Sequence, residues 1–171
     1  GPGGYTENRG RPHEIVVKGN YAYIADYCTG MHIVDIQDKS NPNIISTYNY
    51  TYGGTGYYSV KVVNDYAYLV GKDTTLEIID ISNPLNPTYV SRCETYFSDL
   101  WMSVYINNGF AYVLTQLGYL LIIDISNVEL LQIVSTYRTL LSPTRLFLDD
   151  YYAYITGDYI GLQIIDISNP L

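Results

Sequence analysis

The chain has 171 residues, 47% of them hydrophobic, so it is long enough and apolar enough to fold around a core. Charged residues make up only 15% while tyrosine occurs 21 times, a composition that favours strands and an extracellular setting. The formal charge is −8 and no cluster of lysine and arginine occurs, which argues against nucleic acid as a partner. No apolar run approaches the roughly 20 residues that a membrane-spanning helix needs.

The first 13 residues differ in character from the rest. They begin with Gly1-Pro2-Gly3-Gly4, contain Arg9-Gly10-Arg11 and show no apolar alternation. The segment has neither the basic nor the apolar region of a secretory signal. We therefore expect residues 1–13 to be a flexible leader or the remnant of a tag.

A repeat begins after this segment. An aromatic residue, alanine and tyrosine recur in that order, with the alanines at Ala22, Ala67, Ala111 and Ala153, which are 45, 44 and 42 residues apart. An aspartate follows each alanine by 13 residues, at Asp35, Asp80, Asp124 and Asp166. Such a fixed period is the signature of a repeat architecture.

Each repeat predicts four strands in chain order. The first alternates apolar and other residues, as at Ile15 and Val17, and the second contains the Tyr-Ala-Tyr motif. The third ends at the aspartate and is apolar on both faces, as expected for a sheet between two neighbours. The fourth ends in a serine at Ser46, Ser91 and Ser135, and the fourth repeat stops at Leu171, before this strand.

The spacing therefore predicts an all-β fold, a β-propeller of four blades of about 42–45 residues with four strands each. The last blade is expected to lack its outer strand. The predicted blades are residues 14–56, 57–100, 101–143 and 144–171. Exposed sheet edges are normally covered or paired, so four blades could close into a tight ring, two chains could form a larger ring, or open ends could join head to tail into a filament. Of these, pairing of the unpaired edge with another chain is favoured.

The stretches Ile-Ile-Asp-Ile-Ser-Asn-Pro at 78–84 and 164–170, with Tyr-Ala-Tyr upstream, resemble the LVIVD repeat. The likeness extends over nearly the whole chain from about residue 14. It implies a propeller that is secreted or displayed on a bacterial or archaeal surface, and it implies no reaction. The first repeat departs from the motif with Ile36-Gln37-Asp38 and the third with Val128 in place of proline, which changes turns rather than chemistry.

The four aspartates are interpreted as parts of the scaffold. A catalytic or metal site is a single asymmetric constellation, whereas a residue that every blade needs appears in every blade. We expect each aspartate to accept hydrogen bonds in the turn that follows it. Asp149, Asp150 and Asp158 invite a calcium site, but paired aspartates at a strand end more often form a turn. We expect no metal, no cofactor and no catalytic residues, and neither His13 nor His32 has a recognisable partner.

Aromatic residues gather in the connections from each outer strand to the next inner strand, where nearly all of the length variation falls. Clustered aromatics on variable loops suit protein contacts or stacking on sugars, although several of these side chains, Trp101 among them, could instead begin the inner strand and pack between blades. The candidate binding residues are Tyr48, Tyr50, Tyr52, Tyr57, Tyr58, Tyr96, Phe97 and Trp101. Asn49 begins the sequon Asn49-Tyr50-Thr51 and is a candidate glycosylation site.

The two cysteines are too few for a disulfide framework, and their spacing is not that of a CxxC motif. Cys28 follows the second strand of the first blade and Cys93 lies near the end of the outer strand of the second. Both positions approach one face of adjacent blades, so we consider a Cys28–Cys93 disulfide, whose Cα atoms would lie within about 7 Å.

These observations predict a non-enzymatic module, extracellular or on the cell surface, for protein interaction and self-assembly. Its partners would be itself, as an oligomer or filament, or another surface protein. The alternative is a carbohydrate-binding propeller that recognises glycans, and a third class is an enzyme that uses the propeller channel.

Overall fold

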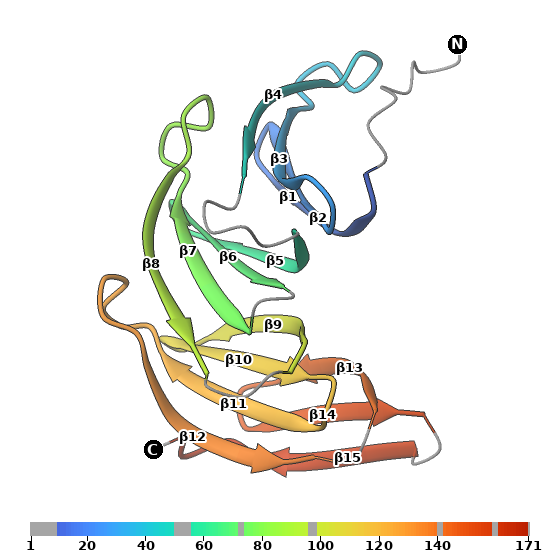
Figure 1. Cartoon of the computed structure of the whole chain (residues 1–171), viewed down its shortest axis with the longest axis vertical. Helices are drawn as coiled ribbons and strands as arrows, with labels where there is room; N and C mark the ends of the chain where they lie inside the picture. The colour runs from blue at the N-terminus through green and yellow to red at the C-terminus, as the bar shows by residue number, and fades with distance from the viewer. Residues whose placement is uncertain are drawn as a thin grey trace.

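The computed structural model describes residues 10–49, 56–71, 74–95, 99–139, 142–158 and 161–170. The described residues form fifteen strands and no helix, in four antiparallel sheets. Within these described residues, no helix is long and apolar enough to cross a membrane. The predicted all-β fold with four blades is confirmed (Figure 1).

The blades follow one another along the chain. Blade 1 contains β1 (Pro12–Lys18), β2 (Tyr21–Asp26), β3 (Gly30–Asp35) and β4 (Asn43–Tyr48). Blade 2 contains β5 (Tyr57–Val63), β6 (Tyr66–Gly71), β7 (Thr75–Asp80) and β8 (Thr88–Glu94). Blade 3 contains β9 (Trp101–Asn107), β10 (Phe110–Thr115), β11 (Tyr119–Asp124) and β12 (Gln132–Arg138). Blade 4 contains β13 (Pro143–Leu148), β14 (Tyr152–Gly157) and β15 (Gly161–Asp166).

Each sheet is a meander in which sequential strands pair, because short turns connect them. The β9–β10 turn is Asn108-Gly109, and both residues have positive φ, the conformation that two-residue hairpins require. A register shift recurs between the third and fourth strands, at Ile33/Val34, Ile78/Ile79 and Ile122/Ile123. The repeat in the sequence is therefore also a repeat of strand register.

The blades are arranged in an arc, with the inner strands β1, β5, β9 and β13 adjacent to one another along it (Figure 1). Side chains alternate along every strand, so each blade has a rear face toward the preceding blade and a front face toward the following one. Blade 1 presents Ile33 at its front, and blade 2 meets it with Val60 and Ile79 from its rear. The same packing recurs between blades 2 and 3 and between blades 3 and 4.

The repeated serines of the fourth strands, Ser46 and Ser91, help to hold neighbouring blades together. The Ser46 hydroxyl donates to the carbonyl of Pro84 in blade 2 at 2.7 Å, and the Ser91 hydroxyl donates to the carbonyl of Val128 in blade 3. Pro84 and Val128 occupy the same repeat position, so the third repeat keeps the acceptor although it lacks the proline. The constant spacing from aspartate to serine thus places each serine hydroxyl within hydrogen-bond distance of the turn in the next blade.

The repeated aspartates lie in the turns as expected. Their Oδ1 atoms accept the backbone N–H two residues later at 2.8–2.9 Å, in all four copies: Asp35 from Gln37, Asp80 from Ser82, Asp124 from Ser126 and Asp166 from Ser168. In the first repeat, Asp38 accepts from Ser40, where the second and third repeats use Asn83 and Asn127. The departure at 36–38 therefore preserves the turn.

The last blade has three strands, as the sequence predicts. The N-terminal boundary differs slightly from the predicted one, since β1 begins at Pro12 rather than after residue 13. Pro12 and Glu14 pair with Asp26 and Ala25 across a register shift. The strand pairing therefore extends two residues into the predicted leader, and residues 1–9 lie outside the described part of the chain.

Candidate binding surfaces

The front face of blade 4 exposes side chains that are buried in every other blade. Ile164 is 54% exposed, whereas its repeat equivalents Ile33, Ile78 and Ile122 are all 0% exposed. Leu162 is 57% exposed, and its equivalents Met31, Leu76 and Leu120 are again 0% exposed. Phe147 and Tyr152 add to this surface. We call these four residues the front end face.

The rear face of blade 1 is the complementary case. Ile15 is 58% exposed, whereas its equivalents Val60, Val104 and Leu146 are at most 2% exposed. Val17, on the same strand and face, is 59% exposed. We call Ile15 and Val17 the rear end face. The two end faces correspond to the two halves of the interface that joins blades 1 to 2, 2 to 3 and 3 to 4.

A third surface lies on the concave side, where the four inner strands contribute residues at equivalent positions to a cavity of about 350 Å³. One row consists of His13, Tyr58, Met102 and Thr144. The next row consists of Glu14, Ser59, Ser103 and Arg145, and Tyr105 and Leu146 complete the lining. We call this cavity the channel-side pocket. Its lining does not repeat from blade to blade, in contrast to the scaffold residues.

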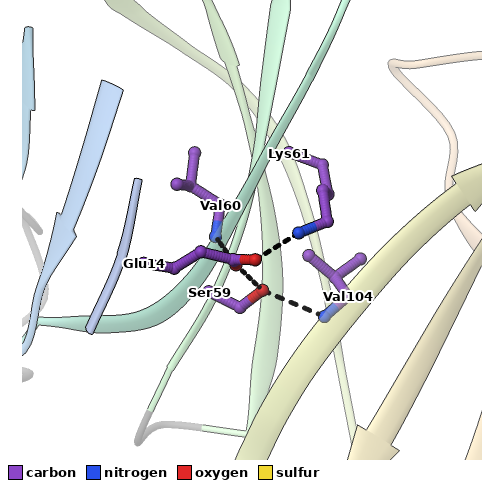
Figure 2. A network of polar contacts seen from close by, with 5 residues as sticks. All are labelled: Glu14, Ser59, Val60, Lys61 and Val104. Carbon is purple, nitrogen blue, oxygen red and sulfur yellow. Dashed lines mark hydrogen bonds and ion pairs between the residues drawn. The ribbon is translucent and has the colours of Figure 1, made fainter. Parts of the chain in front are cut away.

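Glu14 crosses from blade 1 to blade 2 at this pocket (Figure 2). Its Oε2 accepts hydrogen bonds from the Ser59 hydroxyl and, at 2.9 Å, from the Val60 N–H, while its Oε1 pairs with the Lys61 ammonium. The Ser59 oxygen in turn accepts the N–H of Val104 in blade 3 at 3.2 Å (Figure 2). One network therefore links the inner strands of three blades.

The rings near the pocket support one another. The Tyr58 ring packs on His13 at 4.9 Å and on Tyr27 at 5.1 Å between centroids. The Lys61 ammonium lies 4.8 Å from the centre of the Tyr105 ring. Burial raises the pKa of the Tyr58 phenol, and nearby Tyr27 raises it further. Burial also raises the pKa of Tyr105, as does Glu14, so both phenols are neutral hydrogen-bond donors at pH 7.

Three of the four described residues of the predicted aromatic loop face are buried. Trp101 is 0% exposed, Tyr57 is 2% and Tyr48 is 8%, so these three pack between blades and present no ring to solvent. Tyr57 also donates to the buried carboxylate of Glu77. Tyr58 alone of the described candidates is half-buried, in the channel-side pocket. The candidates Tyr50, Tyr52, Tyr96 and Phe97 lie outside the described residues.

The considered disulfide is absent from the structure, where Cys28 and Cys93 are both free thiols. The reason is the direction of Cys93, which is buried in the cluster between blades 2 and 3, away from blade 1. Cys28 is exposed. Burial raises the pKa of the Cys93 thiol to about 11, with a further contribution from Glu94.

Two further predicted positions can be placed. Asn49 is exposed directly after β4, so its side chain is accessible. Asp149 forms a turn, because its carboxylate accepts the N–H groups of Tyr151 and Tyr152 at 2.8 and 2.7 Å and the Tyr154 hydroxyl at 2.8 Å. Among the described residues, no group of three or more His, Cys, Asp or Glu is arranged to hold a metal.

The sequence matches the LVIVD repeat over residues 9–50, 57–95, 101–139 and 145–170. The chain belongs to the LVIVD repeat family. No curated protein matches its sequence.

Solved structures share its fold at low identity. The periplasmic gluconolactonase PpgL of Pseudomonas aeruginosa has 12% identity and a TM-score of 0.78, with 92% of this chain and 50% of that chain covered. The Cps50 (Swd1) β-propeller domain of Myceliophteria thermophila has 10% identity and a TM-score of 0.76, with 94% and 55% covered. The computationally designed protein Ika4 has 9% identity and a TM-score of 0.72, with 93% and 92% covered. This LVIVD chain thus spans about half the length of the two natural propellers.

Proposed function

We propose that this LVIVD chain is a non-enzymatic binding and assembly module that works outside the cell or on its surface, with a second copy of itself as its principal partner. The observation that carries the proposal is the complementarity of the end faces. The side chains of Ile164 and Ile15 are about half exposed, and each belongs to a repeat position that is buried in the other three blades. A second copy placed head to tail would continue the interface that already joins the blades.

The energetics favour association that depends on concentration. Full burial of a large apolar side chain contributes about 1.5–3 kcal/mol, so each half-exposed side chain of the end faces contributes about 1 kcal/mol. The six residues of the two end faces would together contribute about 6 kcal/mol, against an association cost of at least about 4 kcal/mol. The end faces alone thus leave at most about 2 kcal/mol, a dissociation constant of roughly tens of millimolar, so assembly at lower concentrations needs additional contacts.

The free edge of β15 adds to this surface. Among the described residues, β15 pairs with β14 but with no outer strand, whereas β3, β7 and β11 each pair on both sides. A strand edge without a partner offers backbone donors and acceptors to another chain. Strand pairing at this edge would therefore accompany the contact of the end faces.

The non-enzymatic, extracellular part of the proposal has its own support. The repeated aspartates are occupied as turn acceptors, and the Ser59 hydroxyl is buried between Glu14 and Val104. The low content of charged residues suits an extracellular protein, and PpgL is described as periplasmic. PpgL is also described as a lactonase, so hydrolysis of gluconolactone by this chain would contradict the non-enzymatic assignment.

Light scattering over a dilution series tests the assembly. We expect the apparent mass to rise with concentration, and to rise less for a variant with a charge on either end face. A mass equal to that of one chain at all concentrations would refute self-assembly. A second candidate function, carbohydrate binding, is favoured by the channel-side pocket with its tyrosines.

A further inference from the structure

The channel-side pocket carries an excess of positive charge within an acidic protein. The chain has 9 basic and 17 acidic residues, yet the pocket lining includes Arg145 and a single carboxylate, Glu14, which pairs with the adjacent Lys61. Both oxygens of Glu14 are occupied, by Lys61 on one side and by Ser59 and Val60 on the other (Figure 2). Glu14 and Lys61 therefore neutralise each other, and Arg145 supplies the remaining charge.

Arg145 is available to a ligand. Its side chain is exposed and donates to the neighbouring carbonyl of Thr144 at 2.8 Å. Neither of the two ion pairs among the described residues includes it. A guanidinium has five N–H donors in a planar fork that matches a carboxylate, so most of its donors remain for a bound anion.

The rest of the lining suits a polar ring rather than a bare ion. The Tyr58 ring packs on His13 and the Tyr105 ring on Lys61, and both hydroxyls are neutral at pH 7. The Tyr58 hydroxyl is hydrogen-bonded to Tyr27, and its oxygen can accept a further hydrogen bond. The Ser103 hydroxyl makes no hydrogen bond within the described part of the chain, so it is free to donate or accept. A cavity of about 350 Å³ is at the lower end of the range for small-molecule sites and has room for one sugar ring.

We propose that the channel-side pocket binds a sugar acid, with its carboxylate on Arg145 and its ring hydroxyls on Ser103, Tyr58 and Tyr105. A zwitterionic amino acid fits less well, because Glu14 is already neutralised and leaves no acceptor for an ammonium group. A neutral sugar would leave Arg145 without a counter-charge. The site deepens the second proposed function and does not depend on assembly, since all of its residues belong to one chain.

The test is titration calorimetry of the full chain with sodium glucuronate, with glucose and acetate as matched probes. Glucose keeps the ring without the charge, and acetate keeps the charge without the ring. We expect glucuronate to bind at least about tenfold more tightly than either, and Arg145→Gln to weaken it by about tenfold or more, the range of a charge-assisted hydrogen bond. Arg138→Gln is the control, because Arg138 is also exposed but lies over Tyr119 on an outer strand.

Backbone amide shifts locate the binding. We expect glucuronate to shift the amides of residues 102–105 and 144–146, in the wild type and in Arg138→Gln. The proposal is overturned if folded wild type shows no saturable binding up to about 10 mM glucuronate, if acetate binds equally well, or if Arg145→Gln binds like Arg138→Gln. A chain that binds glucuronate but stays monomeric would refute self-assembly and support this site, so the two proposals fail separately.

Discussion

Replacing Ser59 with alanine removes the central member of the network that joins three blades. The Ser59 hydroxyl donates to Glu14 and its oxygen accepts the N–H of Val104, whose residue is 0% exposed. Alanine leaves that buried N–H without an acceptor, which costs about 1–3 kcal/mol. In a chain of this length, each kcal/mol lowers Tm by about 2–4 °C.

The matched control is Ser103→Ala. Ser103 occupies the equivalent position in blade 3, is only half-buried, and its hydroxyl makes no hydrogen bond among the described residues. Urea unfolding at low micromolar concentration measures both variants, and amide exchange of the Val104 N–H reports the broken bond directly. If Ser59→Ala and Ser103→Ala lower the unfolding free energy equally, or if the Val104 N–H stays equally protected, the network does not hold the inner strands together.

Four further outcomes are expected. Asp80→Ala should lower stability by about 0.5–1.5 kcal/mol, measured by urea unfolding, without loss of ligand binding, because it removes one half-exposed turn acceptor; lost binding at unchanged stability would assign Asp80 a functional role. Hydrogen bonds from the following serines lower the pKa of the turn aspartates Asp80, Asp124 and Asp166. The stability that these carboxylates contribute is therefore present above the unfolded pKa of about 4 and is lost as pH falls through the folded pKa values. Acid unfolding followed by circular dichroism measures this loss, and constant stability from pH 5 to pH 2 would contradict it. In native protein, a thiol reagent at pH 8 should label Cys28 rapidly and Cys93 only on unfolding, because Cys93 is buried and its pKa is raised to about 11; equal rates would contradict the packing between blades 2 and 3. Ile164→Glu should weaken self-association by about tenfold or more, measured by sedimentation, while Leu130→Glu, at a 74% exposed apolar residue in a turn outside the end faces, should not; similar effects would indicate non-specific association.

The repeat determined most of the fold in advance. Four apolar runs per repeat predicted four strands per blade, and the fourth copy contains only three of these runs, so the three-stranded blade 4 could be predicted. The role of the repeated serines of the fourth strands could not, because a donor to the next blade's turn depends on how two blades pack. The exposed end faces could have been found from the sequence, because Ile164 and Ile15 occupy repeat positions that face a neighbouring blade in the interior repeats.

The binding residues were harder to predict, because the sequence does not distinguish an aromatic residue that packs between blades from one that binds a ligand. Trp101 begins β9 and is buried between blades, which local sequence does not reveal. The channel-side pocket was not predicted, although the sequence contains a signal for it. One repeat position is acidic in the first copy, neutral in the second and third and basic in the fourth, as Glu14, Ser59, Ser103 and Arg145. Variation at this inner-strand position is therefore a sequence signal for the channel-side pocket, which aromatic content does not give.

The central claim concerns the end faces, and the mass of the chain in solution tests it most directly. One chain is 19.4 kDa. Light scattering from micromolar to millimolar concentration should show a mass that rises in multiples of this value, and Ile15→Glu should reduce the rise as much as Ile164→Glu, because a head-to-tail contact needs both faces. A mass of one chain throughout, or a rise that only one of the two substitutions reduces, would contradict the account.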